Sequence, residues 1–296
     1  MELLAWREVD LPDDVRAIPT MLSPDELTLL YALARDHADG RGAIVDAGCF
    51  LGGSSVALLA GLRDRDREWT GPPLSTYDLF RVEEYTREQF FKGSALKVGD
   101  SFRPLYDQHV APFTSPHVVH EGDITQIGWD GGPIDVFFVD VLKSWEVNAA
   151  VQRSFFPHLI PGRSLIVHQD YGWGMLPWIH LSVELMWDSL RRLDVLPWAT
   201  HVFLLERPVD PDVLALDPLR DLSAADRLAL LDRAIEHNEG EARGMVALSK
   251  ASLLGYSGQR GAALELIEAV EADHPGNASI KACADGTRVM LQASGG

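Results

Sequence analysis

The sequence predicts an α/β fold built on a doubly wound parallel sheet, with helical segments before and after it. Apolar runs of strand length alternate with helical stretches between residues 41 and 208. The first run, residues 43–47, leads through a glycine-rich turn into a helix. After Pro211 the chain changes to helical segments rich in Ala and Leu. We therefore expect an N-terminal helical segment at 1–40, a sheet domain at 41–208 and a helical C-terminal appendage at 209–296.

The composition limits the function classes. The chain has 296 residues, of which 46% are hydrophobic, and a formal net charge of −18. Because nucleic-acid-binding proteins normally carry a basic face, this charge argues against nucleic acid as a partner. The main basic cluster, Arg63, Arg65 and Arg67, alternates with acids and predicts a solvated helix end. The chain has two cysteines that lie far apart in the sequence, which favours a location in the reducing cytoplasm. It has no apolar run of membrane-spanning length, so we expect no membrane partner.

The remaining elements follow from local signals. Ser23, Pro24 and Glu26 predict a capping box and a helix that continues to about His37. Further strands are expected at 74–80, 117–124, 134–140, 164–171 and 201–206. Helices are expected from Ser54, at 145–156 and at 178–193, and the long segment 81–117 should contain more than one helix. In the tail, helices are expected at 223–237, 241–254 and 260–272.

The tail resembles, loosely, a single tetratricopeptide hairpin that ends at Pro275. A solenoid needs about three repeats to bury a core, so one hairpin does not predict a repeat array. We expect the tail to serve packing or homodimer formation rather than peptide recruitment.

The turn after the first strand has the pattern Asp46-x-Gly48-x-x-x-Gly52-x-Ser54. Glycine permits unusual dihedrals and close approach of a ligand to the backbone. The helix that follows presents unpaired N–H groups, which suit an anionic group. A dinucleotide fingerprint requires its second glycine where this chain has Phe50, so a pyrophosphate ligand is disfavoured. Close packing without a ligand is the alternative.

This pattern resembles the first motif of class I methyltransferases that use S-adenosylmethionine (SAM), which have a Rossmann-like fold. The resemblance implies that Asp46, Gly48, Gly52 and Ser54 hold the methionine part of the cofactor. It also places Asp78, at the end of the second strand, at the ribose hydroxyls. Asp123, after the third strand, is placed near the adenine. Strand-end or turn roles are the alternatives for these last two acids.

A narrower resemblance involves the fourth and fifth strand ends. The sequence at these positions resembles that of the macrocin O-methyltransferase group, which modifies sugars on bacterial natural products. The similar residues are Asp140 with the later Trp145-Glu146, and Gln169-Asp170-Tyr171. In that group, acidic side chains hold a magnesium ion that orients the hydroxyl to be methylated.

The metal motif of this chain departs from that of the group. Lys143 stands where a histidine is usual, and Gln169 replaces one acid of a pair. A weak magnesium site at Asp140, Gln169 and Asp170 is one hypothesis. In the alternative, Lys143 replaces the metal by holding a substrate oxygen, or it lies in solvent.

SAM carries an activated methyl group, so the protein must align an acceptor and remove its proton. His168 is the candidate general base, because histidine titrates near neutral pH, and Asp140 is the alternative; structural roles for both also remain open. The sequence thus predicts a SAM-dependent O-methyltransferase of a small molecule, with a sugar-bearing or polyhydroxylated natural product as the expected substrate. N- or C-methyl transfer, and a degenerate SAM- or nucleoside-binding protein with a partner-binding tail, are the alternatives.

Overall fold

The structure is a computed structural model that describes residues 5–197 and 199–293. The chain divides into two compact units. Among the described residues, the first unit contains 5–141 and 158–167, and the second contains 142–157, 168–197 and 199–293. The three expected domains have different boundaries from these units and stay a prediction; residues 1–4 and 294–296, at their outer ends, lie outside the described residues.

Strands of the first unit form the core of an α/β fold. The strands are β1 (Ala43–Ala47), β2 (Leu74–Asp78), β3 (His117–Glu121), β4 (Ile134–Val139) and β5 (Leu165–His168), in the spatial order β3-β2-β1-β4-β5. β1 pairs in parallel with β2 and β4, and β2 pairs in parallel with β3. Because the strand order reverses at β1, the topological switch point lies between β1 and β4. The doubly wound α/β fold class is therefore confirmed.

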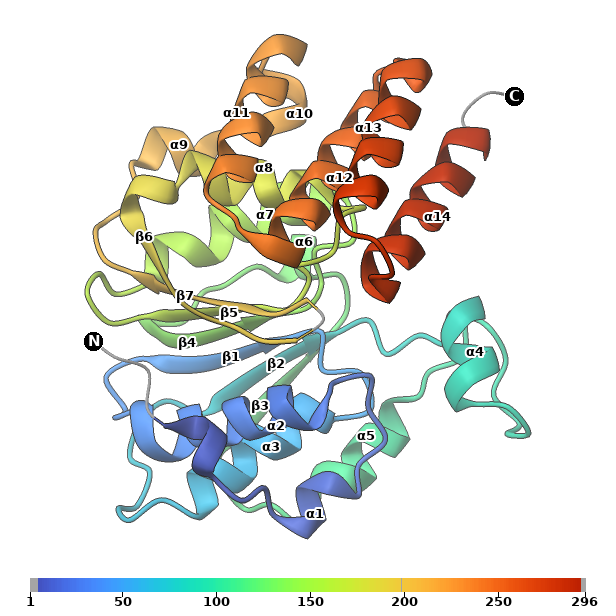
Figure 1. Ribbon diagram of the computed structural model, residues 1–296. Coiled ribbons are helices and arrows are strands. Elements are labelled where there is room, and N and C mark those ends of the chain that lie inside the picture. Colours follow the sequence, from blue (N-terminus) through green and yellow to red (C-terminus); the bar gives the residue numbers. More distant parts are fainter. Residues whose placement is uncertain (1–4, 198, 294–296) are drawn as a thin grey trace. The chain divides into compact units, whose positions relative to one another are not determined.

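Helices of the first unit flank these strands. In Figure 1, α2 (Pro24–Ala32) and α3 (Gly53–Arg63) lie beneath β1 and β2. The predicted capping box is present, since the Ser23 hydroxyl accepts the Glu26 N–H and the Glu26 carboxylate accepts the Ser23 N–H. The other helical elements of this unit are η1 (Trp6–Glu8), α1 (Asp13–Arg16), the π-helical η2 (Leu33–His37), α4 (Glu84–Phe90), α5 (Arg103–Val110) and α6 (Ile124–Ile127). The expected presence of more than one helix in 81–117 is confirmed.

The second unit contains two strands and most of the remaining helices. β6 (Leu190–Val195) pairs antiparallel with β7 (His201–Leu205). The first helices are α7 (Trp145–Phe155), followed by η3 (Phe156–His158), then α8 (Pro177–Leu185) and η4 (Trp187–Ser189). Those after β7 are α9 (Pro211–Ala215), α10 (Pro218–Asp221), α11 (Ala224–Glu236), α12 (Gly240–Tyr256), α13 (Arg260–Asp273) and α14 (Ala278–Ala293).

One predicted helix is wrong in its second half. The helix expected at 178–193 ends at Leu185, and β6 follows it. Leu190 and Leu193 fit a helical spacing, but pairing with β7 supplies this segment with backbone hydrogen bonds across the strand register Leu190↔Leu205. The strands of the chain are consequently mixed in direction rather than all parallel.

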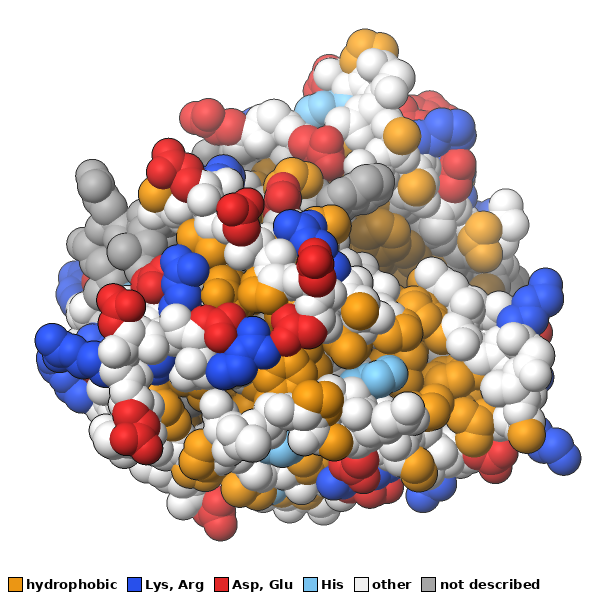
Figure 2. Space-filling view, turned by 90° about the horizontal axis from the view of Figure 1, so that it is seen from below, with side chains coloured by type: hydrophobic (Ala, Val, Ile, Leu, Met, Phe, Trp, Pro, Cys, Tyr) orange, Lys and Arg blue, Asp and Glu red, His pale blue; other side chains and the backbone are white. Residues whose placement is uncertain are grey.

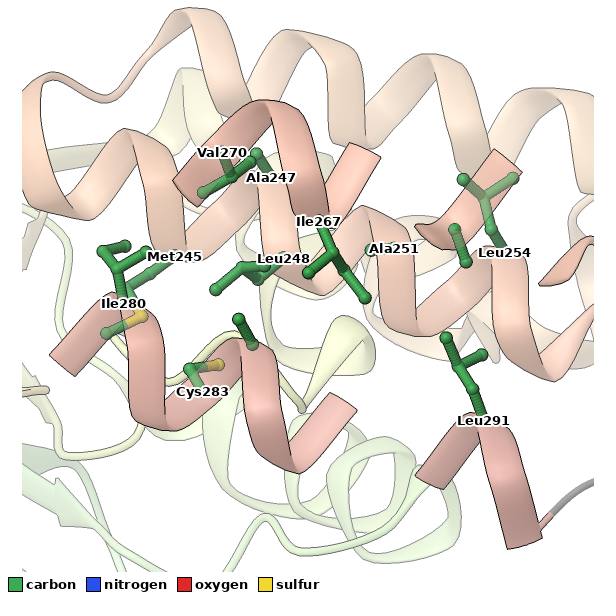
Figure 3. Close-up of a cluster of buried hydrophobic side chains, with 12 residues drawn as sticks. Met245, Ala247, Leu248, Ala251, Leu254, Ile267, Val270, Ile280, Cys283 and Leu291 are labelled. Carbon is green, nitrogen blue, oxygen red and sulfur yellow. The ribbon is translucent and has the colours of Figure 1, made fainter. Parts of the chain in front are cut away.

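The tail helices share a hydrophobic core (Figure 3), which includes the side chains of Leu248, Ile267, Ile280 and Cys283. The three predicted tail helices are confirmed, and α14 is an additional one. Leu181 of α8 packs in a second cluster with Leu230, Leu231 and Leu253. These contacts explain why the second unit contains both α8 and the tail.

Two surface properties bear on the expected partners. Among the described residues, no helix is both long enough and apolar enough to cross a membrane. On the face seen in Figure 2, Lys and Arg side chains lie interspersed with Asp and Glu. Among the ion pairs of the described residues, Arg63 of the predicted basic cluster pairs with Asp14 and Asp64.

Candidate functional site

The predicted glycine elbow lies at the carboxyl end of β1, beside the switch point. Gly48 and Gly52 adopt left-handed φ angles of 98° and 99°. A Cβ atom on Gly48 would lie 2.5 Å from the Asp140 backbone oxygen and 2.9 Å from its carbonyl carbon. The Gly48 N–H donates to the Tyr77 carbonyl over 2.8 Å. Glycine is therefore required at position 48 both by the dihedral angle and by the close approach of the strand end after β4.

Asp78 joins the elbow to the turn that follows β2. The Asp78 carboxylate accepts the Phe50 N–H at Oδ2 over 2.9 Å and the Phe80 N–H at Oδ1 over 2.7 Å. Phe50 and Phe80 both have left-handed φ angles, 46° and 52°, a conformation that costs a non-glycine residue about 1–3 kcal/mol. The carboxylate thus fixes two strained turns at once.

The charge state of Asp78 reflects opposing influences. Burial raises the pKa of its carboxyl group, while the N–H groups of Phe80 and Phe50 lower it. The side chain is half-buried. A carboxylate has about four acceptor sites, so hydroxyl groups of a ligand can still bind to it beside the two N–H groups.

The Phe50 side chain packs within an aromatic cluster. Its ring centroid lies 5.0 Å from that of Phe90, 5.2 Å from Phe102 and 6.1 Å from Phe91, all in edge-on arrangements. Aromatic pairs in this geometry are stabilising beyond their buried area. The aromatic residues of the segment 81–117 therefore support the elbow, and Tyr85 of the same segment is 63% exposed.

Asp46 and Ser54 form a buried polar group behind the elbow. The Asp46 carboxylate accepts the hydroxyls of Ser54, at 2.9 Å, and of Ser55, at 2.5 Å. Tyr106 donates its hydroxyl to Ser55 over 3.2 Å. Burial raises the pKa of Asp46 to about 7. These contacts show how Asp46 and Ser54 hold the elbow to α3, while their contact with a cofactor stays a prediction.

Sequence reasoning missed Ser55 and Tyr106 in this group. The adjacent pair Ser54-Ser55 at the start of a helix was a signal for a buried acceptor, but nothing in the sequence pointed to Tyr106.

Two further predicted acids follow β3 and β4. Asp123 is exposed, and its Oδ1 accepts the Thr125 N–H over 2.9 Å as the N-cap of α6. Asp140 is half-buried, and its N–H donates to the Ala47 carbonyl over 2.8 Å. Asp140 therefore lies at the switch point, next to Gly48, whereas the role of Asp123 at the adenine stays a prediction.

His168, the predicted general base, is a buried side chain. His168 ends β5, belongs to the second unit and is only 3% exposed. Burial, followed by the nearby His180 and Lys143, lowers its pKa to about 3. Its buried Nδ1 atom has no hydrogen-bond partner among the described residues. Burial thus outweighs the ordinary basicity of imidazole at this position, and the role of His168 as general base stays a prediction.

The residues expected to hold magnesium do not fit that ion. Lys143 Nζ lies 2.5 Å from Asp170 Oδ2, so a positive group already contacts this carboxylate. The backbone oxygen of Gln169 accepts the Thr200 hydroxyl over 3.4 Å. No group of three or more His, Cys, Asp or Glu residues that could hold a metal ion occurs within the described parts of the chain.

Aromatic residues after β5 pack inside the second unit. Tyr171 is 1% exposed and Trp178 is 4% exposed. The ring centroid of Tyr171 lies 4.4 Å from that of His201, and Trp178 donates its Nε1–H to the Leu142 carbonyl over 2.6 Å. Their burial favours a packed corner over a stacking wall for a substrate.

Comparisons with known proteins found no matching family model and no matching curated protein. Solved structures give weak similarities. The apo structure of CalS11, a TDP-rhamnose 3'-O-methyltransferase in calicheamicin biosynthesis, has a TM-score of 0.43 and 16% identity over 60% of this chain and 76% of that chain. A SAM-dependent O-methyltransferase from Thermotoga maritima has a TM-score of 0.38 and 16% identity, covering 66% of this chain and 73% of that one.

The pyocyanin biosynthetic protein PhzM has a TM-score of 0.35 and 13% identity, covering 59% of this chain and 52% of that one. Similarity at this level does not carry the activities or substrates of these proteins over to this chain.

Proposed function

We propose that the chain is a SAM-dependent methyltransferase whose first unit binds the cofactor at the β1 elbow. The observation that carries this proposal is the Asp78 carboxylate, which holds the turns after β1 and β2 at the carboxyl edge of the sheet. Ligands of doubly wound sheets bind at this edge beside the switch point. The residue types fit an amino-acid-like ligand with a ribose better than a dinucleotide.

Two parts of the cofactor have candidate binding groups in the first unit. The N-terminus of α3, an 11-residue helix, suits the methionine carboxylate. Asp78 suits the ribose hydroxyls, because a charged acceptor binds two adjacent hydroxyls well. Phe50 occupies the position at which a dinucleotide site has glycine, so its side chain disfavours a pyrophosphate.

We further propose a hydroxyl of a small molecule as the methyl acceptor, with a sugar-bearing or polyhydroxylated natural product as the expected substrate. When bound, SAM would supply a methyl group to the acceptor oxygen, and its sulfur would leave as a neutral thioether that keeps the electron pair of the broken C–S bond. Asp140, half-buried at the carboxyl end of β4, is the candidate acceptor of the hydroxyl proton and releases it to solvent afterwards.

The expected magnesium ion is not included in this mechanism, because Lys143 contacts Asp170. Transfer to nitrogen or carbon, and a SAM- or nucleoside-binding protein without turnover, are the second candidates. The hypothesis of a binding protein without turnover is based on Lys143 and Gln169, which depart from the acidic motif of the methyltransferase group. No nucleic acid or membrane is proposed as a partner; the tail remains a candidate homodimer surface. The cytoplasm is the proposed location, supported by the free cysteines Cys49 and Cys283.

Calorimetry with SAM and with NAD tests the cofactor assignment. We expect saturable SAM binding and none with NAD. Asp78→Asn should weaken SAM binding about 10- to 150-fold, because a hydrogen bond to a charged group is worth about 1.5–3 kcal/mol. Asp66→Asn, which changes an exposed acid of the same unit, is the matched control and should bind as the unaltered protein does. Tight NAD binding without SAM binding would refute the proposal.

A panel of hydroxyl, amine and activated-carbon acceptors then separates the candidate reactions. Formation of S-adenosylhomocysteine only with hydroxyl acceptors supports O-methylation. Binding of SAM without turnover of any acceptor on the panel supports the binding protein instead.

A further inference from the structure

Lys143 and Asp170 form an ion pair in the second unit, at two positions of the motif from which a magnesium site was predicted. The ammonium nitrogen lies 2.5 Å from Asp170 Oδ2. An ammonium group and a divalent cation compete for one carboxylate, and two positive charges held this close repel each other strongly. The ion pair therefore occupies the carboxylate that the predicted magnesium ion would require.

The backbone on the lysine side of the pair is anchored on both flanks. Trp178 donates its Nε1–H to the carbonyl of Leu142 over 2.6 Å, directly before Lys143. Ser144, directly after it, caps α7 by accepting the Val147 N–H over 3.3 Å. These two contacts restrict the position of the Lys143 backbone.

The carboxylate side of the pair is also held in place. The Asp170 carbonyl accepts the Trp173 N–H over 3.0 Å in the turn after β5, and the next residue but one, Gly172, donates to the Ala199 carbonyl over 2.6 Å. The Asp170 side chain is 13% exposed, whereas that of Lys143 is 57% exposed. The ammonium group of a largely exposed lysine thus lies on a mostly buried carboxylate, and its charge opposes the approach of a second cation.

We propose that the Lys143 ammonium replaces a divalent cation in this chain, so that Asp170 binds no magnesium and methyl transfer needs none. The statement about methyl transfer rests on the proposed function, whereas the statement about metal binding does not. An ammonium group donates hydrogen bonds to a carboxylate and stabilises its negative charge, so Asp170 already has a positive partner.

Electron paramagnetic resonance with Mn²⁺, a spectroscopic substitute for Mg²⁺, tests the exclusion of metal on the full chain. The unaltered protein should show no saturable Mn²⁺ binding at millimolar concentrations. Lys143→Gln should bind more Mn²⁺ than the unaltered protein does, because the Asp170 carboxylate loses its positive partner, and adding Asp170→Asn should remove this gain. Lys143→Arg keeps the charge and should exclude Mn²⁺ as lysine does. Lys281→Gln, which breaks the Lys281–Asp285 pair in α14 of the same unit, is the control and should gain no site.

Two metal-binding results would overturn the proposal. One is saturable Mn²⁺ binding to the unaltered protein that Asp170→Asn abolishes. The other is a Lys143→Gln variant, shown by circular dichroism to be folded, that binds no more Mn²⁺ than the unaltered protein does.

Activity gives a separate result. After treatment with a chelator, the unaltered enzyme should keep its full rate of methyl transfer. A chelator-sensitive rate that magnesium restores would refute the proposal. A protein that binds no SAM would instead refute the proposed function, and the Mn²⁺ results would still decide whether Lys143 excludes metal.

Discussion

Asp46→Asn should change how the stability of this protein depends on pH. Asp46 is fully buried and accepts hydrogen bonds from Ser54 and Ser55. Burial raises the pKa of its carboxyl group from the ordinary 3.8 to about 7. The folded protein thus binds this proton more tightly than the unfolded chain does. Asp46 therefore costs no stability below pH 4, and its cost grows as the pH rises to about 7.

The size of the effect follows from the shift. Each pKa unit corresponds to about 1.4 kcal/mol, so the ionised Asp46 carboxylate costs on the order of 4 kcal/mol of unfolding free energy once the pH is above its pKa in the folded protein. Between pH 5 and pH 8 it grows by about 2–3 kcal/mol. Asparagine carries no titrating proton, and its amide can pair with the two serine hydroxyls. Relative to the unaltered protein, Asp46→Asn should gain stability by this amount between the two pH values.

Urea unfolding of both proteins at pH 5, 6.5 and 8, at constant ionic strength, measures the difference. Other titrating groups, such as His168, are present in both proteins and cancel in the comparison. Asp66→Asn, at an exposed site of the same unit, should show no such pH-dependent difference. The prediction is refuted if the stability difference between Asp46→Asn and the unaltered protein stays constant from pH 5 to pH 8. The pKa of the buried Asp46 carboxyl group would then not be raised in the folded protein.

Outcomes for four further variants are expected. Gly99→Ala, at φ 91° and with no atom other than those of its chain neighbours within 4 Å of the added methyl group, should cost about 1–2 kcal/mol from the dihedral angle alone. Gly48→Ala adds a clash with the Asp140 backbone, so it should lower the unfolding free energy in urea by more than about 4 kcal/mol. The same variant should show no SAM binding in calorimetry. Equal stability costs for Gly48→Ala and Gly99→Ala would contradict the close approach of the Asp140 backbone to Gly48. Leu248→Ala removes a fully buried side chain from the tail core and should lower the unfolding free energy by about 2–5 kcal/mol; a loss below that range would show a loosely packed core. The pH–rate profile of methyl transfer should show no ionisation that His168→Gln removes, because burial keeps this imidazole neutral down to a pKa of about 3.

Local pattern was sufficient for most elements of the fold. The apolar run 43–47 and the glycines after it predicted β1, the elbow and α3, and the spacing of Ala and Leu predicted three tail helices. These features depend on dihedral preferences and on periodic burial, which neighbouring residues largely decide. The helix expected at 178–193 failed in its second half because the pairing of β6 with β7 outweighed a weak helical spacing.

Some properties of the site residues could be predicted from the sequence, and others depend on the tertiary structure. The sequence by itself determined that acids lie near the ends of β1 and β2 and directly after β4, and that position 48 carries a residue without a side chain. Only the tertiary structure decided that Asp78 accepts the N–H of Phe50, 28 residues away, and that Lys143 pairs with Asp170, 27 residues away. It also decided that His168 is buried and weakly basic. The reason is physical: a residue's type and its neighbours favour a backbone conformation, whereas its hydrogen-bond partners and solvation depend on segments that folding brings to it from far along the chain.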